Sequence, residues 1–162
     1  MSIDFHGFPV PDSKSRKLFV CSAPYTTFED MTDRQRIRFK PFGLWYACGS
    51  EWVDWLRSEM PDWYEAAKYL YEIKVVQKEV LKLESVKDVL KFNEQHGVYR
   101  TYSQEIDWPT VARQHAGIEI CPYQQRLRMS EDVGWYYPWD VASGCIWNAD
   151  GVKSVELLYA RK

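Results

Sequence analysis

The sequence predicts an α+β fold in which a mixed, mainly antiparallel sheet is flanked by about three helices. The chain has 162 residues, 46% of them hydrophobic, which suits one domain with its own core. Short apolar or alternating runs, typical of strands, are separated by three stretches that carry helix caps. Few of the connections resemble a helical crossover between parallel strands. We therefore expect residues 1–162 to form a single domain, with residues 1–16 as an irregular lead-in rich in Pro and Gly.

The expected strands are short, and each is bounded by turn residues. They cover 17–21, 40–47, 69–76, 80–83, 118–121, 143–147 and 152–159. Residues 123–134 are polar and predict a loop, and Asn148–Gly151 predicts a turn before the last strand.

Three helices are expected from their end signals. Ser50 is a good N-cap for a helix that Pro61 closes. Ser85, followed three residues later by Asp88, predicts a helix that ends at Gly97. Asp107-Trp108-Pro109 opens a third helix, with Pro in the first turn and Gly117 after its end.

Composition narrows the class of protein. The net charge of −2 gives no global basic field for nucleic acid. No apolar run reaches the roughly 20 residues of a membrane span, and the N-terminus lacks a signal-peptide pattern. We therefore expect a cytoplasmic protein that does not contact a membrane. The sequence does not indicate an oligomeric state.

Cysteine and histidine spacing gives no metal motif. The four cysteines form no CxxC pair, and the three histidines share no ligand spacing with them or with each other. The sequence thus predicts reduced thiols and no metal.

An alternation of positive charge precedes the most aromatic part of the chain. Arg34, Arg36, Arg38 and Lys40 recur at every second position, so a strand would present them on one face. One interpretation is an edge strand protected by charge. The other is a phosphate-facing or partner-facing rim of a binding site.

The segment 42–56 is the strongest candidate for a ligand site. The chain as a whole is 16% aromatic, and this segment holds Trp45, Tyr46, Trp52 and Trp55. On a strand, Trp45 and Tyr46 point to opposite sides, so only one of them can face a cleft. Trp52, Trp55 and Leu56 share one helix face and are expected in the core.

Five stretches give the chain a resemblance to the ADP-ribosyltransferase-like fold, in its small single-domain phage and bacterial form. They are 17–22 (KLFVCS), 42–46 (FGLWY), 69–83 with its two strands, and the two late stretches 115–120 (HAGIEI) and 143–148 (SGCIWN). Together they span about residues 17–158. The order of these degenerate motifs carries the resemblance.

The resemblance implies that NAD, as a substrate, is held in a cleft between the halves of the sheet. ADP-ribose would then pass to a host protein or nucleic acid. This is the activity of a mono-ADP-ribosyltransferase, which is a glycosyltransferase that uses NAD. The protein would be a phage or bacterial effector, and it would act in the host cytoplasm if it is phage-encoded. The chemistry needs an aromatic face for nicotinamide, a hydroxyl or backbone clamp for its ribose, and a carboxylate for an oxocarbenium-like transition state. The resemblance gives these roles to candidates in two groups: cofactor-binding Ser22, Gly43, Trp45, Tyr46 and Ser50, and catalytic Asp140, Glu119 and Ser143.

Two positions depart from the family pattern. Ser22 follows Val20 and Cys21 where the family has His or Arg, although it still offers a hydroxyl. Ser143 stands where the family has its late glutamate. Asp140, three residues earlier, is the first choice for the acid, and its alternative role is that of a cap or turn residue. Glu119 is the second choice, and its alternative role is that of an exposed strand carboxylate.

These departures leave two other hypotheses open. The chain can be a non-catalytic nucleotide- or protein-binding module on the same fold. It can also be an interaction protein that uses its Trp clusters as an interface. No GxSxG, Walker or Rossmann pattern supports other chemistry.

Overall fold

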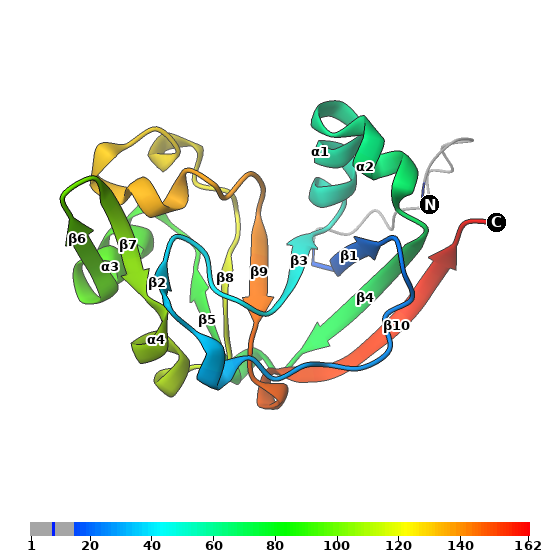
Figure 1. Ribbon diagram of the computed structural model, residues 1–162, viewed down its shortest axis with the longest axis horizontal. Helices are drawn as coiled ribbons and strands as arrows, with labels where there is room; N and C mark the ends of the chain where they lie inside the picture. Colours follow the sequence, from blue (N-terminus) through cyan, green and yellow to red (C-terminus); the bar gives the residue numbers. More distant parts are fainter. Residues whose placement is uncertain (1–7, 9–14) are drawn as a thin grey trace.

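A curled sheet of seven strands and a small sheet of three strands form the framework of the molecule (Figure 1). The computed structural model describes Phe8 and residues 15–162. Most of the expected lead-in, residues 1–7 and 9–14, lies outside the described residues. The α+β class, with a mixed sheet, is confirmed.

The large sheet has the order β10-β4-β1-β3-β9-β8-β5, and only the β5–β8 pair is parallel. Its strands are β1 (Lys17–Cys21), β3 (Leu44–Cys48), β4 (Tyr69–Val75), β5 (Val80–Leu83), β8 (Gly117–Ile120), β9 (Ser143–Ile146) and β10 (Val152–Ala160). These match the seven expected strands.

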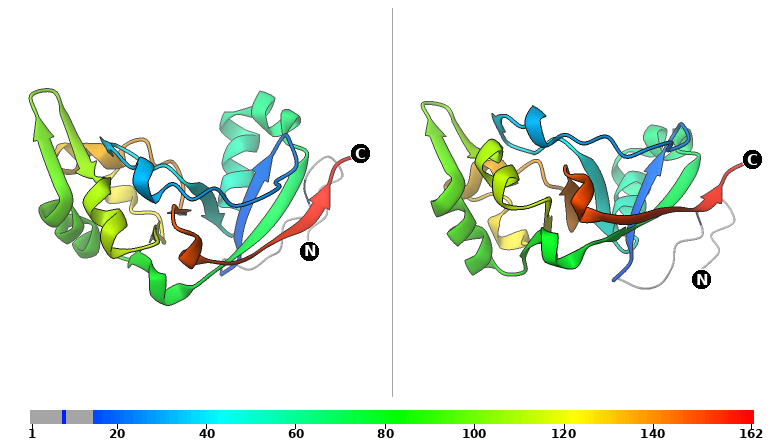
Figure 2. Two further views of the ribbon diagram at one scale, coloured as in Figure 1. Left: turned by 60° about the horizontal axis from the view of Figure 1, so that its bottom comes forward. Right: turned by 90° about the horizontal axis from the view of Figure 1, so that it is seen from below.

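The small sheet, β2-β7-β6, was not expected from the sequence. It consists of β2 (Ile37–Arg38), β6 (Gly97–Arg100) and β7 (Ser103–Asp107). The β6–β7 hairpin projects from the side of the molecule away from β10 (Figure 2). Its segment contains few β-branched residues, and its tip residue Tyr102 is 98% exposed, so no alternating apolar pattern marks it.

The helices are α1 (Glu51–Glu59), α2 (Pro61–Ala66), α3 (Val86–His96) and α4 (Trp108–Gln114). Two of the three expected caps are confirmed: Ser85 Oγ accepts the N–H of Asp88, and the Asp107 side chain accepts the N–H of Thr110. The prediction for Ser50 is wrong in its chemistry, because its hydroxyl donates to Asp54 rather than capping the backbone. Pro61 begins α2, which the sequence did not predict.

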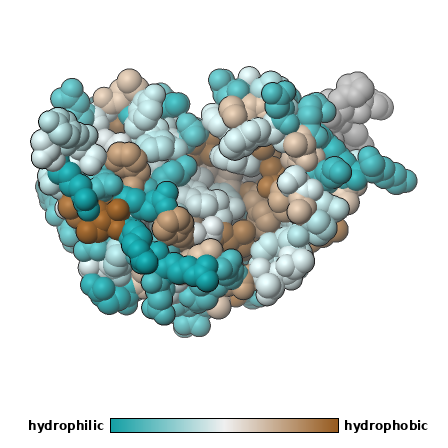
Figure 3. Space-filling model, in the orientation of Figure 1, coloured by the Kyte–Doolittle hydropathy of each residue, from teal (hydrophilic) through white to brown (hydrophobic). Residues whose placement is uncertain are grey.

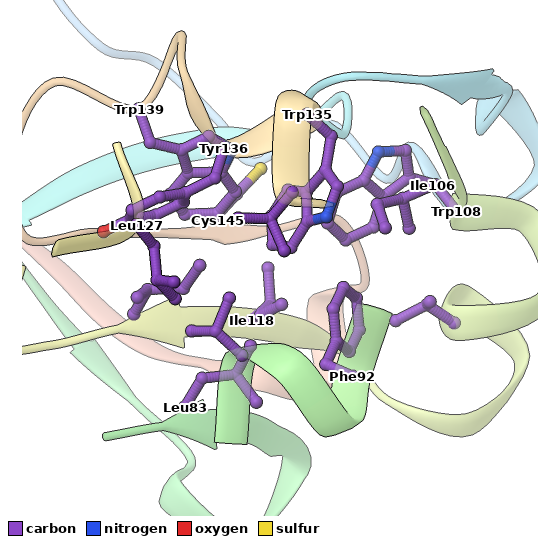
Figure 4. Packing of buried hydrophobic residues seen from close by; sticks show 14 of the residues in the cluster. Leu83, Phe92, Ile106, Trp108, Ile118, Leu127, Trp135, Tyr136, Trp139 and Cys145 are labelled. Carbon is purple, nitrogen blue, oxygen red and sulfur yellow. The ribbon is translucent and has the colours of Figure 1, made fainter. Parts of the chain in front are cut away.

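One core cluster holds half of the eight tryptophans of the chain. Four tryptophans are almost fully buried in it: Trp108, Trp135, Trp139 and Trp147. Figure 4 shows the first three of them together with Phe92 and Tyr136. Three of the indole N–H groups donate to the Arg38 carbonyl, the Asn93 side chain and the His115 carbonyl. Burying these three rings with their N–H groups satisfied stabilises the fold, whereas the buried Nε1 of Trp139 has no hydrogen-bond partner among the described residues.

Two smaller core clusters pack elsewhere along the sheet. One lies between α1, α2 and β4 and includes Leu18, Leu56 and Leu70. The other lies on β1, β3 and β4 and includes Phe19, Tyr46 and Tyr71. Among the described residues, no helix has the length and apolar character needed to cross a bilayer.

Candidate functional site

The large sheet opens between β1 and β3. β1 pairs with β4 at four positions but with β3 at only two, Lys17↔Cys48 and Leu18↔Ala47. Beyond these positions the two strands diverge (Figure 1). The opening separates the β10-β4-β1 part of the sheet from the β3-β9-β8-β5 part.

A cleft of about 760 Å³ occupies this opening. Such a volume suits a ligand of nucleotide size. Residues of β1 and β3 form its walls, the 38–43 segment and Tyr25 form its rim, and Trp52 and Asp140 complete it. Figure 3 shows a hollow with an apolar floor on this face of the molecule.

Trp45 is one of several aromatic residues that line the cleft, and it lies beside Lys40. Its ring is half-buried and meets Trp139 edge-on, with 5.0 Å between ring centroids. Trp139 belongs to the buried cluster of Figure 4, so the position of the Trp45 ring is fixed by the core. A rigid, partly exposed indole of this kind is suited to stack a flat ring.

Tyr46 points to the other face of the sheet, as alternation requires. It is 2% exposed, and its hydroxyl donates to Glu119 at 2.7 Å. Tyr46 is among the residues that border the cleft, but its phenol group is held in a separate buried network with Glu119. Burial and Glu119 together raise the pKa of Tyr46 well above its usual value.

Glycine is required at position 43. Its backbone has φ +154°, and a Cβ built there would lie 2.4 Å from the carbonyl oxygen of Ile146. This close approach brings the start of β3 against β9 and sets the chain that leads into Trp45.

Asp140 lies at the cleft wall with cations around it. The Arg128 guanidinium is 3.4 Å from its carboxylate. Lys40 is also near: its ammonium donates to the Pro138 carbonyl at 2.9 Å and lies 4.7 Å from the Trp45 centroid. Burial lowers the pKa of Lys40, and the charge of Asp140 partly offsets this effect.

Ser143 lines the same cleft, but its hydroxyl is engaged. It is buried and donates to the Val141 carbonyl at 2.9 Å. Ser22 is exposed, and its neighbours Cys21 and Ala23, rather than Ser22 itself, line the cleft. Ser50 lies outside the lining as well.

Glu119 does not meet Asp140. It is 6% exposed and lines a different cavity. Its carboxylate was expected to face either the cleft or solvent, and it faces neither. Lys17 lies 2.7 Å and Lys82 3.2 Å from its carboxylate. Burial would raise the pKa of Glu119, but its hydrogen bonds and these lysines outweigh that effect and lower it.

The prediction of one strand that presents Arg34, Arg36, Arg38 and Lys40 on the same face is wrong. Only Ile37–Arg38 forms a strand, and Arg34 ends a short 3-10 turn, where it pairs with Glu29 at 2.6 Å. Arg34 and Arg36 are exposed, whereas Arg38 and Lys40 line the cleft. The four positive charges therefore do not share one face.

Gln35 explains how the basic segment is bent into this position, a role that no sequence pattern indicates. Its buried amide donates to the carbonyls of Met31 and Phe42, and its oxygen accepts the N–H of Phe42. The indole of Trp108 holds the Arg38 carbonyl at 3.0 Å. These bonds close the loop and direct Arg38 and Lys40 to the cleft.

A scan against protein-family models gives no match for this chain, and searches among curated proteins and among solved structures give none either.

Proposed function

We propose that the protein is an NAD-dependent ADP-ribosyltransferase that modifies a host macromolecule. One observation carries the proposal. The cleft at the β1–β3 opening brings together the three features the chemistry needs: the aromatic face of Trp45, the carboxylate of Asp140 and the backbone of β1 around Cys21. Trp45 and Cys21 belong to stretches that resemble the family, and Asp140 lies three residues before another such stretch.

The reaction breaks the bond between the ribose C1′ and nicotinamide. Nicotinamide leaves with the bonding electrons, an acceptor nucleophile bonds to C1′, and the acceptor releases a proton. Trp45 would stack the nicotinamide ring. The carboxylate of Asp140 would stabilise positive charge that develops on the ribose. Lys40 and Arg38 are placed to bind the pyrophosphate.

The test is release of nicotinamide from NAD, followed by transfer of labelled ADP-ribose to components of a host extract. Asp140→Asn should lower turnover roughly 100-fold or more while NAD affinity changes little, since the lost interaction acts in the transition state. Asp150→Asn, in the turn before β10, is the matched control. Unchanged turnover in Asp140→Asn would refute the role of Asp140.

A non-catalytic nucleotide-binding module is the second candidate, and the surroundings of Asp140 favour it. Arg128 and Lys40 place positive charge beside the carboxylate, which suits bound phosphate and weakens support for a ribosyl cation. The module would bind NAD or ADP-ribose with Trp45-dependent fluorescence quenching but would release no nicotinamide.

A further inference from the structure

Two thiols and a carboxylate meet in a second cavity, which shares no lining residue with the cleft. Cys48 ends β3, while Glu119 lies on β8 and Cys121 follows that strand. The two sulfur atoms and a carboxylate oxygen all lie within 4.8 Å of one another. The cavity measures about 450 Å³.

This donor set matches a particular class of metal ion. Thiolate sulfur combined with one carboxylate oxygen suits zinc and other borderline-soft divalent cations. With Zn–S bonds of about 2.3 Å, two sulfurs of a tetrahedral site lie about 3.8 Å apart. Small side-chain rotations therefore bring the three atoms to ligand positions.

A metal fits the backbone better than a disulfide does. Ala47 and Ile120 both pair with Ser143, so Cys48 and Cys121 are separated by the chain that enters β9. Two strand spacings of about 4.8 Å each separate the strands that lead to these cysteines by roughly 9.6 Å. This is more than the roughly 7 Å that a disulfide spans between Cα atoms. A metal ion with its two sulfur bonds fills this longer gap.

The lysines around Glu119 leave room for an ion. Oε2 accepts from Tyr46 and pairs with Lys17, while Oε1 accepts from Lys82 at 3.2 Å. A carboxylate has about four lone-pair positions, so one remains on Oε1. Replacing the two thiol protons with one divalent cation leaves the net charge of the cavity unchanged, so Lys17 and Lys82 face no additional positive charge.

We propose that Cys48, Glu119 and Cys121 bind one divalent metal ion of the zinc class, with a fourth position open to the cavity. This departs from the sequence expectation of no metal, because the ligands are distant in sequence and only the sheet brings them together. The ion would join the chain before α1, which carries Trp52, to the segment after Cys121, which carries Asp140. The proposal does not depend on the proposed function.

Cobalt substitution tests the proposal. The full-length protein, freed of metal and kept reduced with a phosphine, is titrated with Co²⁺. We expect one ion per chain, a thiolate-to-cobalt charge-transfer band, and loss of that band on addition of Zn²⁺. Cys48→Ser and Cys121→Ser should each lower affinity by more than the roughly 10–100-fold that loss of an outer-shell partner costs. Cys21→Ser, a half-exposed thiol in the cleft, is the matched control and should bind normally.

A second measurement uses the wild-type protein, so its result does not depend on whether the cysteine variants fold. Alkylation of Cys121 in the native protein, located by mass spectrometry, should slow when Zn²⁺ is present, while alkylation of Cys21 should not. Absence of a thiolate band, a band that persists in Cys121→Ser, or equal alkylation with and without Zn²⁺ would overturn the proposal. Recovery of a Cys48–Cys121 disulfide instead of metal binding would do the same.

Discussion

The ammonium group of Lys40 lies 4.7 Å from the centroid of the Trp45 ring, at the wall of the cleft. The same nitrogen donates to the carbonyl of Pro138 at 2.9 Å. An ammonium has three donors, so the others can reach a ligand. The cleft thus offers one partly desolvated cation beside its principal aromatic face, an arrangement suited to a ligand with a flat ring and a phosphate.

Lys40→Met should weaken binding of ADP-ribose and NAD roughly 10- to 150-fold, because a hydrogen bond to a charged group contributes about 1.5–3 kcal/mol. Isothermal titration measures this change. Lys74→Met, at a half-exposed position on β4, should leave affinity unaltered. An equal loss in both variants would contradict a specific role for Lys40.

Affinity for ADP-ribose should fall as the pH rises, and the fall should begin at a lower pH than the one at which an ordinary lysine loses its charge. Burial lowers the pKa of Lys40, so its charge is present below that lowered value and is lost as the pH rises through it. The loss therefore begins below the usual lysine value of about 10.4. In Lys40→Met this pH dependence should disappear, and its persistence would exclude Lys40 as the titrating group.

Trp45→Ala should lower NAD affinity roughly 5- to 150-fold, because stacking of a base on an aromatic side chain contributes about 1–3 kcal/mol. Quenching of tryptophan fluorescence by NAD should decrease in the same variant. Trp63→Ala, in α2, removes an indole that is 60% exposed and does not line the cleft. That control should keep both affinity and quenching.

Gly43→Ala should destabilise the protein by about 1–3 kcal/mol, the usual cost of forcing an extra carbon into a packed site. The new Cβ would meet the Ile146 carbonyl at 2.4 Å and Cys145 Sγ at 2.8 Å. Gly134→Ala is the control, since its Cβ would meet only Gln104 at 3.7 Å. Urea denaturation of both variants compares the two, and equal stability would contradict the steric argument.

Glu119→Gln should lower stability by about 3–5 kcal/mol at neutral pH, since it leaves the nearly buried Lys17 without its partner. The pKa of Glu119 is lowered in the folded state, so its contribution is present above the ordinary carboxyl pKa and is lost as the pH falls through the folded value. The difference from wild type should therefore shrink in acid.

Denaturation with a chelator present, from neutral to acidic pH, measures the Glu119 effect. Glu156→Gln removes the partner of Lys74, in a pair whose side chains are both 55% exposed. This control should change stability by less than about 1 kcal/mol. A pH-independent difference for Glu119→Gln would show that the carboxylate charge is not responsible.

Much of the fold could be predicted from local patterns. Alternation placed Trp45 and Tyr46 on opposite faces of β3, and the caps at Ser85 and Asp107 fixed the starts of α3 and α4. These signals act over a few residues, so they survive without knowledge of the rest of the chain. Ser50 does not cap because its backbone is already helical, with φ −79° and ψ −2°, whereas a capping residue has extended backbone; its hydroxyl donates to Asp54 instead.

The candidate site was only partly predictable. Gly43, Trp45, Asp140 and Ser143 do line one cleft, but Glu119 lies in another cavity. Arg36, Arg38 and Lys40 all lie in the 35–42 loop that Gln35 closes, and only Arg38 and Lys40 of these three line the cleft. A buried glutamine that bonds to backbone four and seven residues away has no recognisable sequence pattern, so the bend it imposes on the basic segment could not be predicted.

The sequence by itself determined the strands of the large sheet, the starts of two helices and the aromatic character of β3, because these depend on neighbouring residues. Tertiary structure decided which side chains share a cavity. The partial pairing of β1 with β3 opens the cleft at Trp45 and Asp140, and the order β3-β9-β8 brings Cys48 to Glu119 and Cys121. Both depend on pairing between segments far apart in the chain, where one strand's register sets the neighbours of the next.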